Sequence, residues 1–307
     1  MISSFFGKAK PIHLVVISSL LLLVFCVAKL YTIHQPFTIE LFIKQVLLFG
    51  VCMLSLFVLD FFVSKNNLTK KNSYKILMFG LFIALLPETI LNSKILIANL
   101  FVLLALRRVI SLRSQKEIKK KLFDAAFWVT IATLFYFWAS LFYILIFAAL
   151  FLYSISDIKN WIIPFVAIIC VLIIGASYMI VMQIDFETYL NGLVTFSFDF
   201  SPLNSKRIII AATLLFSYGV WALFYYVKNI KNKSKSYRPS YVLIIISLLL
   251  ALLIITISPN KNGSEFIFLF APLAIIFSNY LEVVSEKWFK EGLIIVLILV
   301  PIIMLML

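Results

Sequence analysis

The sequence has 307 residues, of which 64% are hydrophobic and 13% are charged. So few polar residues cannot give a domain of this size a wetted surface, which excludes a soluble protein. The formal net charge of +14 does not indicate a nucleic-acid partner, because the basic runs lack the aromatic interleaving and fold context of such a site.

The apolar residues come in repeated blocks of roughly 15 to 23, the length at which a helix crosses a hydrocarbon core of about 30 Å. We therefore expect an all-α fold, a polytopic helical transmembrane bundle of about 11 helices (9–11) that forms a single transmembrane domain over residues 1–307. The expected helices cover residues 12–33, 41–63, 74–91, 95–112, 122–138, 140–154, 160–182, 207–228, 241–258, 266–283 and 292–307.

The first block, residues 12–33, follows Lys8 and Lys10. It is too long for the apolar region of a signal peptide and lacks a small-residue cleavage site, so we expect a retained helix. With the amino terminus inside, 21 of the 27 basic residues fall in cytoplasmic segments, as the positive-inside rule requires. The pattern predicts a multi-pass protein of a bacterial inner (cytoplasmic) membrane with a cytoplasmic N-terminus.

A first hairpin with short arms is expected from residues 76–87 and 95–106. Its polar tip carries Glu88 and Lys94, and each arm is short for a full crossing. Two interpretations follow. The tip either faces a water-filled cavity below the outer membrane surface, as at the binding sites of some membrane proteins, or it is a plain loop at the interface.

A second hairpin is expected in the apolar run of residues 125–153, with a turn near Trp138. A single tilted crossing would move the basic run 228–238 to the outside, against the positive-inside rule. The two halves are short, so they form either two full spans or a re-entrant pair.

The longest outer connection, residues 183–206, carries apolar residues at helical spacing, namely Phe186, Tyr189, Leu190 and Leu193. Asp185 and Glu187 lie on other faces of the same helix. We therefore expect an amphipathic connection that lies along the outer face of the membrane.

No motif in the sequence names a reaction. HExxH, P-loop, GxGxxG and GxSxG patterns are missing, which argues against a zinc protease, an ATPase, an ordinary dehydrogenase and an α/β-hydrolase. The sequence identifies neither a cofactor nor a protein partner, so membrane lipids are the expected partners.

Three segments carry a resemblance to known proteins: MISSFFGKAKPIHL, LPETILNSKILIANLFVLLALRRVISL and SPNKNGSEFIFLFAPLAIIFSNYLE. Together they resemble an uncharacterised multi-pass inner-membrane protein family of Bacteroidota, over nearly the whole chain. More distantly, the helix number and the polar outer loop before a proline-containing helix are similar to the GT-C-type glycosyltransferases, which take sugars from polyprenyl-phosphate carriers at the outer face.

The GT-C resemblance implies a set of site residues. GT-C enzymes carry paired acids in the first outer loop, and here that loop holds Glu40 alone, the expected general base or metal ligand. A second carboxylate would come from Glu88, Asp185 or Glu187. The cations expected to neutralise the carrier phosphate are Lys94, Lys206, Arg207 and Lys261.

Two other functions fit the same sequence. The chain is alternatively a non-catalytic subunit or assembly factor of a cell-envelope complex. A transporter is less favoured, because ionisable residues deep in the helices are scarce.

Overall fold

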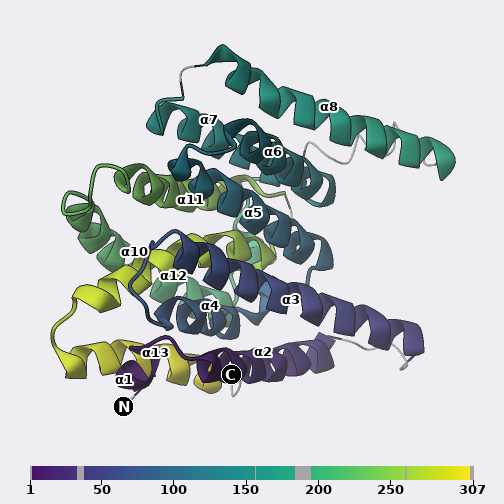
Figure 1. Ribbon diagram of the computed structural model, residues 1–307. Coiled ribbons are helices and arrows are strands. Elements are labelled where there is room, and N and C mark those ends of the chain that lie inside the picture. Colours follow the sequence, from purple (N-terminus) through teal and green to yellow (C-terminus); the bar gives the residue numbers. More distant parts are fainter. Residues whose placement is uncertain (1, 33–37, 156, 184–194, 260, 305–307) are drawn as a thin grey trace.

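The computed structural model describes residues 2–32, 38–155, 157–183, 195–259 and 261–304, and these ranges contain helices and no strand (Figure 1). The α-helices are α1 (Ile2–Phe6), α2 (Pro11–Thr32), α3 (Ile39–Lys65), α4 (Tyr74–Leu85), α5 (Ser93–Ser111), α6 (Ile118–Phe135), α7 (Tyr143–Leu152), α8 (Ile158–Val181), α10 (Lys206–Ile230), α11 (Arg238–Ile257), α12 (Ile267–Val283) and α13 (Lys287–Met304). The 3-10 segments are η1 (Pro87–Ile90), η2 (Leu112–Ser114), η3 (Phe137–Phe142), η4 (Ser201–Leu203) and η5 (Ser264–Phe266).

Seven of the described helical segments are long and apolar enough to cross a membrane. They comprise α2, α3, α5, α8, α10, α11 and α12, the last with its preceding turn η5. Two further apolar segments, Tyr74–Leu85 and Phe137–Leu152, are shorter. The chain is therefore an all-helical, multi-pass membrane protein. That the chain crosses the membrane more than seven times remains a prediction.

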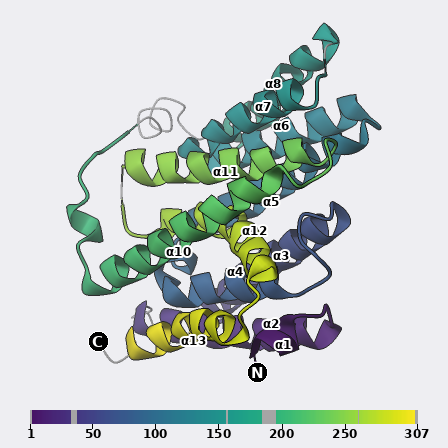
Figure 2. The same cartoon turned by 90° about the vertical axis from the view of Figure 1, so that its left-hand side faces the viewer.

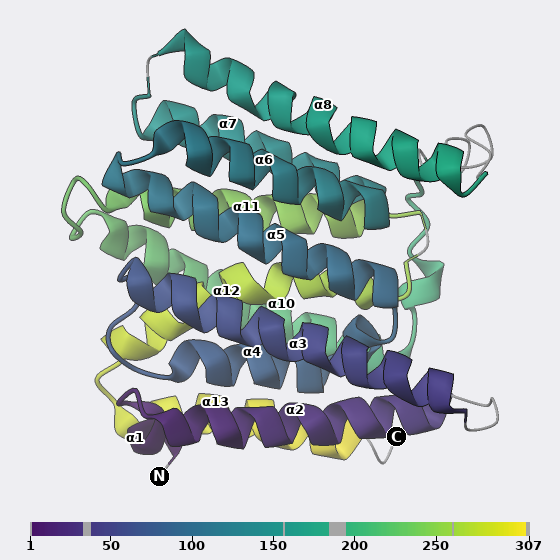
Figure 3. The ribbon, with the colours of Figure 1, turned by 45° about the vertical axis from the view of Figure 1, so that its right-hand side comes forward.

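Successive long helices run in opposite directions, so their connections gather at two ends of the bundle (Figure 3). The end called here the basic end carries residues 2–10, 66–73, 112–117, 153–155, 157, 231–237 and 284–286. The opposite end carries residues 86–92, 136–142, 195–205, 258–259 and 261–266. Nine lysines and arginines lie in the first set of segments, against Lys261 alone in the second, so the charge of the connections is strongly asymmetric.

Helices α4 and α12 form the centre of the bundle (Figure 2). Every residue of α12 from Ile267 to Leu281 is buried, and α4 is buried at every position except Ala84. The Phe82 ring of α4 packs against the α12 rings of Phe270 and Phe277, with centroids 5.9 and 6.4 Å apart. Both helices are surrounded by protein, so their sequences show no separation into an apolar and a polar face.

The two hairpins of the sequence analysis turn at the opposite end. Helix α4 has 12 residues, about 18 Å of helix, which is much shorter than a hydrocarbon core of about 30 Å. It ends in η1, and the Asn92 side chain then caps α5 by accepting hydrogen bonds from the backbone N–H groups of Lys94 and Ile95. The run 125–153 is broken at η3, which contains the predicted turn residue Trp138.

Only part of the predicted amphipathic connection 183–206 can be compared with the structure. Residues 184–194, and with them Asp185 and Glu187, lie outside the described residues. The following stretch is not helical until η4, and its backbone is tied to the second hairpin, because Trp138 Nε1 donates to the carbonyl of Thr195 at 3.1 Å.

Candidate functional site

A pocket of about 260 Å³ lies beside the tip of the first hairpin. Its apolar walls come from α2, the end of α4 and α13, including Leu20, Val24, Leu81, Ile298 and Pro301. Glu88 of η1 and Arg207 of α10 are its charged lining residues. The site is therefore a narrow apolar space with a carboxyl group and a guanidinium group at one place on its wall.

Local sequence fixes the position of Glu88. Pro87 occupies the first turn of η1, where its missing N–H leaves no donor unpaired. Thr89 closes the turn by donating from its hydroxyl to the carbonyl of Leu86 at 2.7 Å. The chain therefore turns sharply after α4, and Glu88 projects beside the pocket instead of continuing the apolar helix.

The Glu88 carboxyl group is unusual because it is mostly buried and only partly satisfied. Its Oε2 atom is buried and has no hydrogen-bond partner among the described residues. Burial raises the pKa of Glu88, while a hydrogen bond from its own backbone and the charge of Arg207 act in the opposite direction. A carboxyl group in this position holds a proton more readily than one in water, as a general base or acid requires.

The pocket opens toward the side of the bundle. Leu23 of α2 and Ile302 of α13, which line it, are 61% and 49% exposed. In a bilayer these side chains would face lipid, so the mouth lies between α2 and α13 on the membrane-facing surface. An apolar chain can therefore enter from the membrane while a polar group reaches Glu88 and Arg207.

A second buried acid at the same end, Glu265 of η5, is paired where Glu88 is not. Ser258 donates from its hydroxyl to Glu265 Oε1 at 3.2 Å, and the Tyr136 hydroxyl donates to Ser258 at 3.0 Å. The carboxylate also receives backbone hydrogen bonds from its own turn. Glu265 therefore holds the turn between α11 and α12 together, and the sequence analysis gave it no role.

Lys261 is buried and makes its contacts with backbone. Its ammonium group donates to the carbonyl oxygens of Ser197 and Ser258, the latter at 2.8 Å, and it lies 4.8 Å from the centre of the Phe200 ring. It thus joins the segment before η4 to the turn after α11. In this structure Lys261 is a structural cation beside the site and does not line the pocket.

The structure places the predicted site residues in different surroundings. Glu88 and Arg207 are brought together at the pocket, while Lys94 and Lys206 are exposed at the first turns of α5 and α10. Glu40 is exposed in the first turn of α3 and is not among the residues that line the pocket. Within the described part of the chain, no three acid, histidine or cysteine side chains are grouped as a metal site would require.

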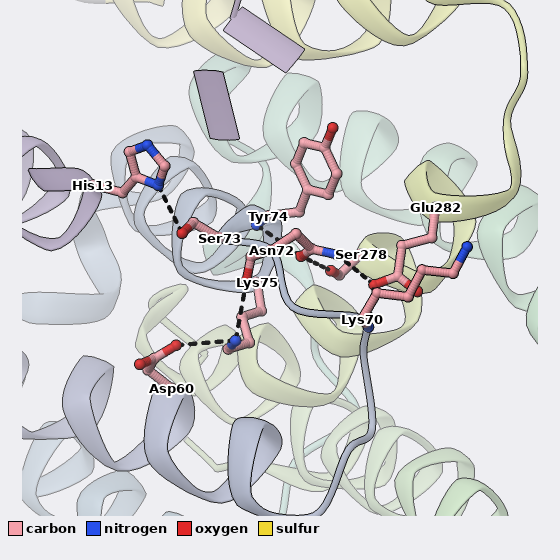
Figure 4. Close-up of polar contacts among 9 residues, drawn as sticks. All are labelled: His13, Asp60, Lys70, Asn72, Ser73, Tyr74, Lys75, Ser278 and Glu282. Carbon is pink, nitrogen blue, oxygen red and sulfur yellow. Dashed lines mark hydrogen bonds and ion pairs between the residues drawn. The ribbon is translucent and has the colours of Figure 1, made fainter. Parts of the chain in front are cut away.

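A polar network lies at the basic end, and it was not predicted from the sequence (Figure 4). Glu282 of α12 accepts hydrogen bonds from the backbone N–H of Lys70 at 2.7 Å and from the Asn72 amide at 2.6 Å. Lys75 of α4 forms a 3.0 Å ion pair with Asp60 of α3. The contacts of Glu282 hold the segment 66–73 against α12, and the ion pair joins α3 to α4.

His13 belongs to the same region. It is fully buried, its Nδ1 atom lies 2.8 Å from the Ser73 hydroxyl, and its ring packs between Phe5 and Phe6. Asp60 and Lys75 are 15 residues apart and on different helices, so no helical spacing in the sequence indicates that they pair. The network is built from structural contacts, and its described residues do not line the pocket beside Glu88.

Comparison with known proteins gives a family but no activity. No curated protein and no solved structure matches the chain. A family model does match, over residues 12–307, which includes the pocket, both hairpins and all helices from α2 onward. The chain therefore belongs to the DUF6427 family, a family of unknown function.

Proposed function

We propose that the protein binds a lipid-linked anionic substrate in the pocket between α2, η1 and α13. The observation that carries this proposal is the buried Oε2 atom of Glu88, which has no hydrogen-bond partner among the described residues and belongs to an apolar pocket that Arg207 also lines. Folded proteins pair nearly all of their buried polar atoms, so an unpaired one beside a cavity points to a ligand. The ligand class is a polyprenyl phosphate or a sugar-linked polyprenyl phosphate, whose apolar chain suits the walls and whose phosphate suits Arg207.

The proposed reaction is glycosyl transfer from such a carrier, as the resemblance to GT-C-type enzymes implies. A hydroxyl group of an acceptor would attack the anomeric carbon of the sugar, and Glu88 would take the hydroxyl proton. The bond between that carbon and the carrier phosphate oxygen would break, and the oxygen would leave with the electron pair. Arg207 would balance the charge that develops on the leaving phosphate.

A second candidate function is a non-catalytic subunit or assembly factor of a cell-envelope complex that binds the lipid without transforming it. The exposure of Glu40 favours this candidate, because the acid of the first outer loop does not line the pocket. Under this proposal Arg207 still holds the lipid phosphate and Glu88 only shapes the polar end of the pocket.

The two candidates are separated by two substitutions and one matched control. Binding is measured by titrating detergent-purified protein with undecaprenyl phosphate. Arg207→Gln should weaken binding roughly tenfold or more, because it removes a charge-assisted contact. Lys94→Gln removes a cation that is exposed at the same end, and it should leave binding unchanged. Unchanged binding by Arg207→Gln would overturn the proposed site.

Transfer is tested with Glu88→Gln in a deletion strain whose envelope glycolipids and glycoproteins are profiled by mass spectrometry. An enzyme should lose roughly 10²-fold or more of its activity, while lipid binding changes little. A stable Glu88→Gln protein that binds the lipid and restores a wild-type profile assigns the non-catalytic function. A deletion that alters no glycoconjugate counts against glycosyl transfer altogether.

We also propose that the protein lies in a bacterial inner membrane with its N-terminus in the cytoplasm. The charge asymmetry of the two ends supports this orientation. Single cysteines at Ser234, at the basic end, and at Asn262, at the opposite end, are introduced in a background that lacks the native cysteines. An impermeant maleimide applied to spheroplasts should label position 262 alone, and labelling of position 234 would reverse the orientation.

A further inference from the structure

A second cavity lies on the other side of α10. It is a groove of about 1300 Å³ between α10 and α11, closed at one end by Phe200, Leu203 and Phe266. Its walls are almost wholly apolar. The hydroxyl groups of Ser217 and Thr256, which line it, donate to backbone carbonyls within their own helices, so they present little polarity to a ligand. The groove is about five times the size of the pocket.

The groove opens along the side of the bundle. Val220, Trp221 and Phe224 line it and are 70%, 52% and 67% exposed. Large apolar side chains that are this exposed on a membrane-spanning helix face the hydrocarbon region. The long side of the groove is therefore open to lipid, in contrast to its closed end near η4.

Positive charge surrounds the closed end. The Lys261 ammonium group lies against the ring of Phe200, which lines the groove. Lys206 and Arg207 are exposed and directly precede the lining residues Ile208 and Ile209. Two acids lie nearby. Asp199 is exposed, and its carboxylate accepts hydrogen bonds from the backbone N–H and the hydroxyl of Ser201. Glu265 is buried and accepts a hydrogen bond from the Ser258 hydroxyl, so three cations face two acids. The balance at this end favours an anionic group.

Gly263 links the groove to the pocket. A Cβ atom placed on this residue would lie 3.4 Å from the Glu88 Cβ atom and 3.4 Å from the Ile208 Cδ1 atom. Glu88 lines the pocket and Ile208 lines the groove. Its φ of +87° is a backbone conformation that side chains other than glycine rarely adopt. The polar ends of the two cavities therefore meet at a single backbone turn.

We propose that the groove binds a second membrane lipid, an anionic phospholipid whose head group lies at the exposed Lys206, near the buried ammonium group of Lys261. The protein then holds two lipids whose head groups meet around Gly263, one in the pocket and one in the groove. In combination with the proposed function, which this inference extends, the groove lipid is the acceptor whose hydroxyl group lies near Glu88. The proposal that a lipid binds in the groove does not depend on glycosyl transfer, because it is argued from the shape and charge of the groove itself.

The test counts the lipids that purified protein retains from nanodiscs of phosphatidylglycerol, phosphatidylethanolamine and undecaprenyl phosphate, by native mass spectrometry. Ala212→Phe fills the groove and Ala84→Phe fills the pocket, since each residue lines its own cavity. Each variant should retain one lipid fewer than wild type. The control is Gly175→Phe on α8, where an added Cβ atom meets nothing within 4 Å, and its lipid count should not change.

The two substitutions test the groove and the pocket independently. If Ala212→Phe retains as many lipids as wild type, the groove proposal is wrong while the pocket stands. If only Ala84→Phe is without effect, the pocket proposal is wrong while the groove stands. If the Ala212→Phe protein does not fold, a second variant tests the groove. Lys206→Gln should lower the preference of the retained lipid for phosphatidylglycerol over phosphatidylethanolamine about threefold or more. Lys235→Gln at the basic end is its control, and an equal preference in both variants would overturn the head-group assignment.

Discussion

Two half-buried glutamates at the two ends of the bundle have opposite surroundings. Glu282 at the basic end accepts hydrogen bonds from Lys70 and Asn72 and helps to fix the segment 66–73. Glu88 at the opposite end leaves Oε2 without a hydrogen bond among the described residues and faces an apolar pocket. An acid that stabilises the fold therefore has hydrogen-bond partners within the protein. An acid that it leaves unsatisfied costs stability and is kept for another reason.

The largest expected effect is at the basic end, where Asp60→Asn removes the partner of Lys75. Lys75 is 3% exposed, so the substitution leaves a buried ammonium group without its counter-charge. The expected loss is roughly 3 kcal/mol of unfolding free energy. It is measured by reversible unfolding in mixed micelles.

The matched control for this pair is Glu117→Gln, in the pair with Lys120 whose side chains are 69% and 70% exposed. An exposed ion pair contributes about 0 to 1 kcal/mol. If Asp60→Asn and Glu117→Gln had equally small effects, the basic end would not be the stabilising region that the comparison describes.

A smaller loss is expected for Asn72→Ala. The Asn72 side chain donates to Glu282 and accepts hydrogen bonds from the backbone N–H of Tyr74 and the hydroxyl of Ser278. Its removal leaves buried groups on two helices with fewer partners, which costs roughly 2 kcal/mol. Unfolding in mixed micelles measures this loss, and Asn232→Ala in the exposed connection 231–237 is the control. Equal stability of the two variants would contradict the role of Asn72.

At the opposite end, Glu88→Gln should change the pH dependence of stability. Burial raises the pKa of Glu88 above its ordinary value, so the folded state binds a proton more tightly than the unfolded state does. Stability from this group is present below the ordinary pKa of about 4.5 and is lost as pH rises through the raised value. Wild-type protein should therefore lose stability relative to Glu88→Gln over this window, as thermal melts at several pH values would show. Parallel curves for the two proteins would contradict the burial of an ionisable Glu88.

The smallest effect is expected for Glu40→Gln. Glu40 is an exposed residue in the first turn of α3, where one charge contributes within about 0.5 kcal/mol to stability. Its loss should leave lipid binding in the pocket unchanged. If Glu40→Gln instead lowered transfer roughly 10²-fold in the complementation assay, the role of general base would return to Glu40.

The sequence predicted the elements of the fold better than their contacts. Blocks of apolar residues and the distribution of basic residues indicated a multi-pass helical protein and a turn near Trp138, and the structure has both. These features are local or depend on charge alone, so they can be read from one chain. The short arms of the first hairpin also indicated Glu88 as a candidate site residue, because a polar tip between short helices is unusual in a membrane.

The apolar walls of the pocket could not be predicted, for a physical reason. In a bilayer, the lipid-facing and the buried side of a helix are both apolar, so periodicity does not reveal which residues face a neighbour. Nothing in the sequence therefore indicates that Leu23 and Pro301, almost 280 residues apart, line one pocket. The ion pair between Asp60 and Lys75 is likewise a contact that only the packing of α3 and α4 creates.

The central position of α4 constrains how the protein is made. At 12 residues this helix is too short to be stable alone across a bilayer, and its main neighbour α12 begins at Ile267, 182 residues after α4 ends at Leu85. At about 5–20 residues per second, synthesis of that interval takes roughly 10 to 40 s. During this time α4 has only its earlier neighbours α2 and α3 to pack against. The centre of the bundle is therefore completed late in synthesis, and chains that end before α12 should be substrates for membrane quality control.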